Sequence, residues 1–298
     1  MTSKVLEKKW KNRMNYERKN KMEYIAEIGS NWYNGDPKSH WSNLKSLIKS
    51  LKNKAEYIKF QAWDTPKFVH MEHPDYDVYE KYELPKTWYS RIVKECGDKF
   101  MVTAFDEETS DEFHKLGCTN WKIASGDLPH LKLIGHIARY NQPMFLSTGN
   151  GNEYEISRAV NYIRKYNTAP LTILHCISKY PTLLSECGFG MLKKLVYKYG
   201  LNCKIGWSNH VSYPDAAIAT ATAKALGATV IETHVRSTGA ESPDASFAMT
   251  EDEFGLFKRE IELIDMEDPI IDEHELLWAR RGDDGLRPWI DWEVRDGK

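Results

Sequence analysis

The stretch CKIGWSNHVSYPDAAIATATAKALGATVIETHV (203–235) places two short apolar runs on either side of a longer amphipathic segment. The runs CKIGWSN (203–209) and TVIETHV (229–235) have the largely apolar character of strands that are buried on both faces. The segment between them, YPDAAIATATAKALG (213–227), has helical periodicity and ends at Gly227, a residue typical of helix C-caps. The predicted buried face of this helix consists of Ala217, Ile218, Ala221 and Leu226. Strand, helix and strand in this order indicate a parallel α/β unit.

Six further apolar runs precede this stretch, and most are followed by an amphipathic segment. They are YIAEIGSN (24–31), YIKFQAW (57–63), FMVTAF (100–105), WKIAS (121–125), PMFLSTG (143–149) and LTILHC (171–176). The starts of the eight runs lie 21 to 43 residues apart, which is the length that a strand, a helix and their two loops require. Eight such units predict a (β/α)8 TIM barrel over residues 23–268, with a basic N-terminal extension (1–22) and a short C-terminal tail (269–298). Because periodicity does not show whether the sheet closes, a doubly wound sheet of seven or nine units remains an alternative.

The composition of the 298 residues indicates a globular chain without a strong charge bias. Its 41 basic and 43 acidic side chains nearly cancel, so we expect no nucleic-acid partner, which would require a local excess of Lys and Arg. No run reaches the ~18 apolar residues of a membrane helix, and the first 21 residues lack the apolar segment of a signal peptide, so no membrane partner is expected. The five cysteines form no C-x-x-C pair, which favours a reduced, cytoplasmic protein without a disulfide framework.

Polar side chains occur at the carboxyl end of nearly every predicted strand, which is where the active site of a TIM barrel lies. They are Glu27, Asn31, Lys59, Gln61, Thr103, Asp106, Lys122, Ser125, Asp127, Ser147, Thr148, His175, Ser178, Ser208, Asn209, His210 and His234. A charged group in a core strand needs a partner, because an unpaired buried charge is costly. Cations, hydroxyls and imidazoles that converge at one end of a barrel predict an anionic, phosphorylated small ligand and a metal ion.

Two lysines lie in the middle of predicted strands, Lys59 in I-K-F-Q and Lys122 in W-K-I-A-S. Period-2 alternation places each on the face opposite its apolar neighbours, which in a barrel can be the interior. With nearby hydroxyls they would form a cradle for phosphate and carboxylate groups through charge-assisted hydrogen bonds. The hydroxyls are those of Thr103, Ser125 and Ser147. Alternatively, the lysines reach the rim of the barrel or bridge to Glu27.

His210 and His234 end two consecutive predicted strands, which are neighbours in a barrel. Two neutral imidazoles one strand apart can bind a divalent ion, with water and substrate oxygens as the remaining ligands. A structural, hydrogen-bonded role for both histidines is an equally good interpretation. Cys176 follows another predicted strand, and we interpret it as a small buried residue and not as a nucleophile.

Ten motifs, taken in order along the chain, resemble those of one family of enzymes. They are AEIGSN (26–31), IKFQ (58–61), YELP (82–85), TAFD (103–106), KIASGDL (122–128), LSTG (146–149), LHCISKYPT (174–182), IGWSNH (205–210), ATVIETH (228–234) and SPDASFAMTEDEF (242–254). Together they resemble the sialic acid synthase family, which includes the N-acetylneuraminate synthases and their legionaminate and pseudaminate relatives. The resemblance covers residues 24–265, the whole predicted barrel.

The resemblance implies that the barrel condenses phosphoenolpyruvate with the open-chain aldehyde of an N-acetylated hexosamine, giving a nine-carbon 2-keto acid and phosphate. It implies that Mn²⁺ or Mg²⁺ is held by His210 and His234. It also implies that phosphoenolpyruvate is bound by Lys59, Thr103, Lys122, Ser125, Ser147, Ser178 and Ser208. At the sugar and the reacting carbons it places Glu27, Gln61 and Asp127, with Tyr180 and Asp244 nearby. The expected catalytic residues within this set are Glu27, Lys59, Gln61, Lys122 and Asp127.

The chain departs from the family pattern in two ways that limit what carries over. The usual Ser-Asp-His motif of the seventh strand is here Ser208, Asn209 and His210, which removes a charge beside an expected metal ligand. Only about thirty residues follow the predicted barrel, whereas the usual family enzyme continues into a C-terminal antifreeze-like domain that reaches the partner subunit. We therefore expect a homodimer formed through an interface other than a swapped antifreeze-like domain. Two alternatives are the same chemistry on a different sugar acceptor, and a non-catalytic barrel that binds a sugar or a partner enzyme.

Overall fold

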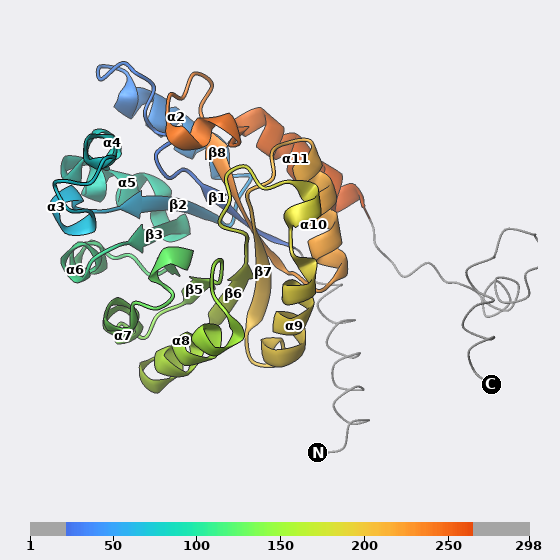
Figure 1. The fold of residues 1–298 in the computed structure, drawn as a ribbon. Helices are drawn as coiled ribbons and strands as arrows, with labels where there is room; N and C mark the ends of the chain where they lie inside the picture. Colours follow the sequence, from blue (N-terminus) through green and yellow to red (C-terminus); the bar gives the residue numbers. More distant parts are fainter. Residues whose placement is uncertain (1–21, 265–298) are drawn as a thin grey trace, which may run out of the picture. The chain divides into compact units, whose positions relative to one another are not determined.

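The computed structural model describes residues 22–264, so the predicted C-terminal tail and all but Met22 of the predicted N-terminal extension lie outside the described residues. Strands alternate with helices along the described part of the chain (Figure 1). The strands are β1 (Glu23–Glu27), β2 (Tyr57–Ala62), β3 (Phe100–Ala104), β4 (Trp121–Ile123), β5 (Met144–Ser147), β6 (Leu171–His175), β7 (Lys204–Asn209), β8 (Val230–Arg236) and β9 (Met249–Thr250). The α-helices are α2 (His40–Leu51), α3 (Thr65–Phe68), α4 (Tyr76–Tyr82), α5 (Tyr89–Cys96), α6 (Glu107–Lys115), α7 (Leu131–Ala138), α8 (Glu153–Tyr166), α9 (Phe189–Tyr199), α10 (Asp215–Ala225) and α11 (Glu251–Leu263).

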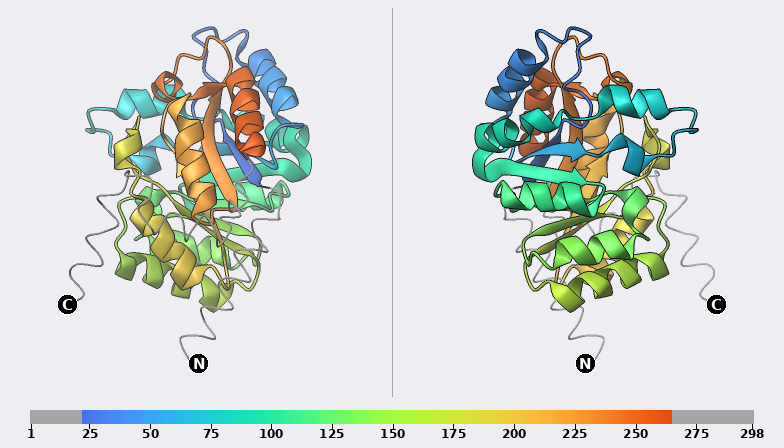
Figure 2. Two further views of the ribbon diagram at one scale, coloured as in Figure 1. Left: turned by 90° about the vertical axis from the view of Figure 1, so that its right-hand side faces the viewer. Right: turned by 90° about the vertical axis from the view of Figure 1, so that its left-hand side faces the viewer.

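Among the described residues, β1 to β8 form one parallel sheet in chain order, and the sheet closes because β1 also pairs with β8. At the closure, Glu27 lies opposite His234. Each predicted apolar run overlaps one of these eight strands, and the strand bounds exceed the run by one residue at Glu23 and at Arg236. The predicted TIM barrel is therefore confirmed, and the open doubly wound sheet is excluded. Helices cover the outside of the barrel (Figure 2).

Helix α10 differs from its sequence pattern in the face that it buries. Its buried residues are Ala216, Ala219, Thr220 and Ala223. Of the predicted face, Ala217, Ala221 and Leu226 are partly buried and pack against the core. Ile218 has 56% of its surface exposed, so the prediction is wrong for this residue. Small residues occupy most sides of this helix, and the sequence therefore marks no single apolar stripe. The helix ends close to the predicted residue, with Leu226 as the C-cap and Gly227 directly after it at a φ of 102°, which favours glycine.

The interior of the barrel contains two layers of opposite chemistry. The lower layer is an apolar cluster of Ile25, Met101, Phe145, Leu174 and Val230, with Tyr57 packed against it. Two residues further along each of these strands, and therefore on the same side of the sheet, comes a polar or sulfur-bearing residue. This upper layer consists of Glu27, Lys59, Thr103, Ser147, Cys176 and Glu232, each at most 3% exposed. The alternation of the strands thus places buried charges at the carboxyl end of the barrel.

All five cysteines are buried. The absence of a disulfide framework stays a prediction. Within residues 22–264, no helix is both long enough and apolar enough to cross a membrane. The cytoplasmic location stays a prediction.

Candidate active site

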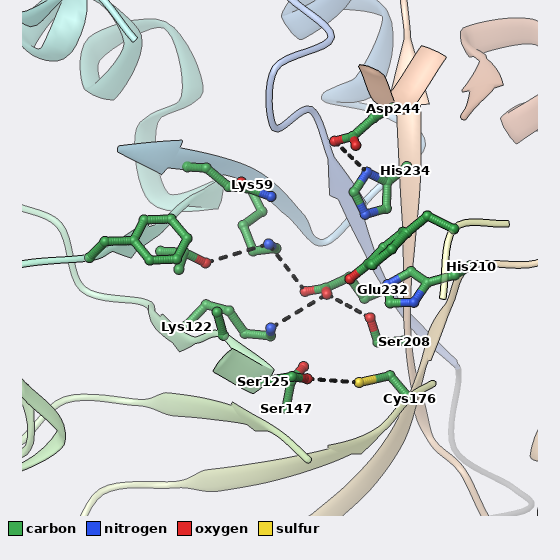
Figure 3. Close-up of a pocket in the computed structure, with 15 residues that line it drawn as sticks. Lys59, Lys122, Ser125, Ser147, Cys176, Ser208, His210, Glu232, His234 and Asp244 are labelled. Atoms are coloured by element: carbon green, nitrogen blue, oxygen red, sulfur yellow. Dashed lines mark hydrogen bonds and ion pairs between the residues drawn. The ribbon is translucent and has the colours of Figure 1, made fainter. Parts of the chain in front are cut away.

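A cavity of about 200 Å³ is bordered by the upper layer at the carboxyl ends of the strands (Figure 3). Of the fourteen predicted site residues, eleven line it, namely Lys59, Gln61, Thr103, Lys122, Ser125, Ser147, Tyr180, Ser208, His210, His234 and Asp244. The remaining lining residues are Phe105, Ala124, Cys176 and Glu232. Side chains from six strands and from the loops that follow them therefore meet in one small polar space.

Glu232 is the central carboxylate of the cavity, and the sequence analysis did not select it. Its Oε2 atom lies 3.7 Å from the Lys59 Nζ atom, and its Oε1 atom lies 3.5 Å from the Lys122 Nζ atom. The Ser208 hydroxyl donates a hydrogen bond of 2.8 Å to Oε1. Although burial raises the pKa of Glu232, Lys122 and Lys59 together hold it at about 2. A signal was present in the sequence, because Glu232 precedes His234 by two residues and so shares its face of the strand.

The two lysines differ in how well their charges are compensated. Lys59 forms an ion pair with Glu27, and Gln61 donates a hydrogen bond of 2.9 Å to the same carboxylate. Burial lowers the pKa of Lys59, but Glu232 and Glu27 outweigh this effect and raise it. Burial also lowers the pKa of Lys122, and there Glu232 offsets the effect only in part. The predicted bridge from Lys59 to Glu27 is confirmed, and Lys59 also lines the cavity, whereas its role in binding an anion stays a prediction.

Serine hydroxyls form a cluster on the side of the cavity next to Lys122. The Ser125 Oγ atom accepts a hydrogen bond of 3.0 Å from the Gly149 amide and lies 3.0 Å from the Cys176 Sγ atom. Among the described residues, the buried hydroxyls of Ser147 and Ser178 have no hydrogen-bond partner. A Cβ atom on Gly149 would lie 2.5 Å from the Ser178 Oγ atom, so only glycine fits here without a shift. Because unpaired buried hydroxyls are costly, this cluster is suited to a ligand with several acceptor oxygens.

The imidazoles of His210 and His234 both line the cavity and contact each other edge to face, with ring centroids 5.6 Å apart. The His210 Nδ1–H group donates to the Ile177 carbonyl over 2.6 Å, which leaves Nε2 with its lone pair free. Burial and the neighbouring His234 lower the pKa of His210 to about 3, so this ring is neutral. The Nδ1 atom of His234 lies 3.3 Å from the Asp244 carboxylate, which raises the pKa of His234 against the effect of burial.

These two imidazoles supply only part of a metal coordination sphere. Within residues 22–264, no group of three or more His, Cys, Asp or Glu side chains is arranged to hold a metal ion. A neutral His210 ring, fixed by a carbonyl, and a His234 ring backed by a carboxylate match the way in which ligating histidines are oriented in proteins. The pair therefore fits a divalent ion whose other ligands are substrate oxygens and water.

Three predicted site residues do not line the cavity. Glu27 lies behind Lys59 and Gln61, fully buried. Asp127 lies 3.5 Å from the His130 ring, and burial raises the pKa of its carboxyl group. Ser178 adjoins the hydroxyl cluster beside Gly149. The roles of these three residues in binding or catalysis stay predictions.

Asn209 stands where the family usually has aspartate, and its side chain makes hydrogen bonds within the fold. Its amide donates hydrogen bonds to the Val211 carbonyl (2.9 Å) and to the Thr233 hydroxyl (3.2 Å). Its carbonyl oxygen accepts a bond from the Val211 amide. A carboxylate could not donate to the Val211 carbonyl, so this contact accounts for the asparagine without reference to the cavity.

Comparison with known proteins matches most of this chain to one family. A family model described as the NeuB family matches residues 46–267. An N,N'-diacetyllegionaminic acid synthase of Campylobacter jejuni is 30% identical over 231 residues, which cover 70% of this chain and 66% of that enzyme. An uncharacterized protein of Methanocaldococcus jannaschii is 31% identical over 246 residues, which cover 81% of this chain and 70% of the relative. The chain thus spans about two thirds of the length of these curated relatives.

A solved structure shows the same fold. The crystal structure of an N-acetylneuraminic acid synthetase from Leptospira borgpetersenii, in complex with citrate, superposes with a TM-score of 0.74. The match covers 88% of this chain and 92% of that chain at 24% sequence identity. At this level of identity the likeness shows the architecture of the barrel.

Proposed function

The chain belongs to the NeuB family, and from this premise we propose that it condenses phosphoenolpyruvate with an amino-sugar aldehyde of the N-acetylhexosamine type. The products would be a nonulosonic, sialic-acid-like 2-keto acid and phosphate. A relative named as a legionaminic acid synthase supports a reaction of this class. The observation that carries the proposal is that one cavity is lined by Lys122, a poorly compensated buried lysine, and by Ser147, whose buried hydroxyl has no partner among the described residues.

Lys122 is the cation that an anionic ligand would stabilise most. Its nearest carboxylate, Glu232, lies 3.5 Å away and already accepts a hydrogen bond from Ser208. On the same side of the barrel, the hydroxyls of Ser147 and Ser178 lack partners. Phosphoenolpyruvate carries a phosphate and a carboxylate, whose oxygens accept charge-assisted hydrogen bonds from such groups. A neutral sugar would leave the Lys122 charge uncompensated.

The proposed reaction forms one C–C bond and breaks one C–O bond. The C3 carbon of phosphoenolpyruvate attacks the aldehyde carbon, whose oxygen takes up a proton and becomes a hydroxyl. Water then adds to the cationic C2 carbon and loses one proton. The hydroxyl so formed loses its proton to the departing phosphate as the C2–O bond to phosphate breaks, which leaves the C2 ketone. Lys122 and the serine hydroxyls would hold the phosphate and carboxylate oxygens through these steps. Glu232 would fix the two lysine ammonium groups on either side of it.

The acceptor sugar would lie at the opposite side of the cavity. Gln61, Tyr180 and Asp244 line the cavity and would offer an amide, a phenol and a carboxylate to sugar hydroxyls. Glu27, fixed by Lys59 and Gln61, would stabilise the cationic C2 carbon or accept a proton from water.

A divalent ion, Mn²⁺ or Mg²⁺, is proposed to bind between His210 and His234. The charges around the cavity support this, because the two ammonium groups of Lys59 and Lys122 equal in number the two carboxylates of Glu27 and Glu232, although Glu232 offsets the effect of burial on Lys122 only in part. Phosphoenolpyruvate brings additional negative charge, and a divalent ion would restore the balance. When bound, the ion would act as a Lewis acid on the aldehyde oxygen.

The test is phosphate release from phosphoenolpyruvate in the presence of Mn²⁺ and a panel of aldoses. We expect release that depends on an N-acetylated hexosamine, with a nine-carbon 2-keto acid identified by mass spectrometry. Release with a different sugar alone would assign the same chemistry to another acceptor. Binding of phosphoenolpyruvate without turnover on any aldose would contradict the proposal and favour a non-catalytic barrel.

Assembly and location are proposed in the same way. We propose a homodimer through an interface of the barrel itself, and analytical ultracentrifugation of the full chain tests it. A monomer across the micromolar range would contradict this assignment. The proposed cytoplasmic location is supported by the five cysteines of the sequence, an odd number without a C-x-x-C pair, which is typical of reducing compartments.

A further inference from the structure

One thiol of the barrel lies in the wall of the active-site cavity. Cys176 follows β6 directly and is only 3% exposed. The other thiols with a hydrogen-bond acceptor point at backbone carbonyls, as Cys118 does at Asn120 (3.4 Å) and Cys187 does at Leu183 (3.6 Å). The sulfur of Cys176 instead lies 3.0 Å from the Ser125 hydroxyl oxygen, a side-chain atom that also lines the cavity.

The hydrogen bonds of Ser125 restrict where its own hydrogen can point. A hydroxyl oxygen has one hydrogen to donate and two positions at which it can accept. The Gly149 amide fills one accepting position over 3.0 Å. If the thiol of Cys176 fills the second, the hydroxyl hydrogen of Ser125 is left to point at a ligand in the cavity. If Ser125 donates to the sulfur instead, a bound anion loses this donor.

The relative strengths of the groups decide between these two arrangements. A thiol is a weak donor and its sulfur a weak acceptor, whereas a hydroxyl is a strong donor to an anion. When an anion is bound, the total hydrogen bonding is therefore best if the hydroxyl donates to the anion and the thiol donates to the hydroxyl oxygen. The unpartnered, 2% exposed hydroxyl of Ser147 in the same wall independently marks this place for a ligand oxygen.

We propose that Cys176 is a positioning residue for the anionic substrate. Its S–H group donates to Ser125 Oγ, fills the second accepting position, and thereby directs the Ser125 hydroxyl at the phosphate or carboxylate of the ligand. The geometry that fixes Ser125 includes Gly149, whose missing side chain leaves the space in which Cys176, Ser125 and Ser178 meet. We call the two successive hydrogen bonds, from the Cys176 thiol to the Ser125 hydroxyl and from that hydroxyl to the anion, the relay. The identity of the anion as phosphoenolpyruvate rests on the proposed function, whereas the relay rests on the contacts of Cys176 and Ser125.

Three variants test the relay by kinetics. Cys176→Ala removes the donor, and because one net hydrogen bond is affected we expect the KM for phosphoenolpyruvate to rise about three- to tenfold with kcat nearly unchanged. Cys176→Ser retains a donor and should stay within about twofold of the wild-type KM, by the same reasoning. Cys118→Ala, which removes a buried thiol outside the cavity, is the matched control and should leave the KM unchanged. A KM that is the same in Cys176→Ala and wild type, in well-folded protein, would overturn the proposal.

An infrared measurement tests the relay without turnover. The S–H stretching band of Cys176, identified by its loss in Cys176→Ser, should shift to lower frequency when phosphoenolpyruvate or inorganic phosphate is added. The band of Cys118 should not move. A shift without turnover would support the relay and count against the synthase function, whereas normal turnover with an unmoved Cys176 band would refute the relay and leave the synthase function standing.

Discussion

The two layers inside the barrel are built from the same strands, yet the lower layer consists of apolar side chains and the upper layer contains buried polar and charged side chains. On β5, Phe145 belongs to the apolar lower layer, and Ser147, two residues later, is a buried hydroxyl without a partner. On β8, Val230 is apolar and Glu232 is a buried carboxylate between two lysines. In each strand the backbone is equally regular, and only the step toward the carboxyl end changes the chemistry.

This contrast indicates that the lower layer stabilises the barrel, whereas the upper layer is suited to binding a ligand. Burying an apolar side chain stabilises a fold by about 1.5–3 kcal/mol. Burying a polar group without a partner instead costs about 1–3 kcal/mol. A closed barrel supported by the lower layer can therefore carry orphan hydroxyls and a poorly compensated Lys122 at its carboxyl end. Substitutions in the two layers should separate stability from activity.

The largest expected effect is a loss of stability from the lower layer. Phe145 is 3% exposed and packs edge-on against Tyr57 with ring centroids 5.1 Å apart. Phe145→Ala should lower the free energy of unfolding by about 3–5 kcal/mol, because it removes buried surface and leaves a cavity. Urea denaturation followed by circular dichroism measures this. Ile218→Ala, at an exposed position, is the control, and an equal loss in both variants would break the assignment of stability to the lower layer.

The next effect is on activity and comes from the imidazole pair. His234→Ala should reduce kcat/KM with Mn²⁺ about a thousandfold, since a Lewis-acid ion contributes several kcal/mol to such a step. The unfolding midpoint of His234→Ala should stay close to that of the wild type, and isothermal titration should show weaker Mn²⁺ binding. We expect the same loss of activity and of Mn²⁺ affinity in His210→Ala. His136→Ala, at a partly exposed histidine outside the cavity, is the control. Full activity or unchanged Mn²⁺ affinity in His234→Ala would remove this residue from the metal site.

The sequence predicts the two layers unevenly. The strands were predictable because apolar runs of strand length recur at regular spacing, and Lys59 and Lys122 stood out because a lysine inside such a run conflicts with burial. Glu232 was missed although alternation places it on the same face as His234. Its role becomes evident only from the closed barrel, which brings Lys59 and Lys122 within 4 Å of its carboxylate.

Beyond the strand ends, the alternation of side chains no longer predicts which residues face the cavity. There the conformations of the loops determine the positions of the side chains. The positions of Ser178 and Asp127 relative to the cavity follow from turns that the residue pattern does not specify. The contact between Cys176 and Ser125 joins loops 51 residues apart, so no local pattern reports it. The buried face of α10 was likewise not readable, because alanine at several turns makes more than one face acceptable.

A smaller effect is expected at Ser147, where one substitution should raise stability and weaken binding of phosphoenolpyruvate. Ser147→Ala removes a buried hydroxyl without a partner, so stability should rise by about 1 kcal/mol while the KM for phosphoenolpyruvate rises about two- to tenfold. Ser208→Ala is the informative counterpart, because that hydroxyl already donates to Glu232 and its loss should lower stability. Denaturation and kinetics on both variants give the comparison. If Ser147→Ala were less stable than wild type, the hydroxyl would have a partner in the folded protein and the distinction between the layers would fail there.

The smallest expected effect is on the pH dependence of stability and concerns Tyr57, whose phenol packs against the lower layer. Burial, with Glu23 and Glu56 nearby, raises the pKa of Tyr57 from 10.0 to about 12. The unfolded chain therefore loses this proton at a lower pH than the barrel does, so the contribution of Tyr57 to stability is complete below pH 10 and is lost as the pH rises toward 12. Tyr57→Phe should flatten the decline of unfolding free energy over this range by less than about 1 kcal/mol, since Tyr57 is only partly buried and solvent screens the charge. Parallel stability curves for the variant and wild type between pH 9 and about 12 would show that the phenol ionises as freely in the barrel as in water, and the lower layer would then extend less far toward Tyr57 than its packing indicates.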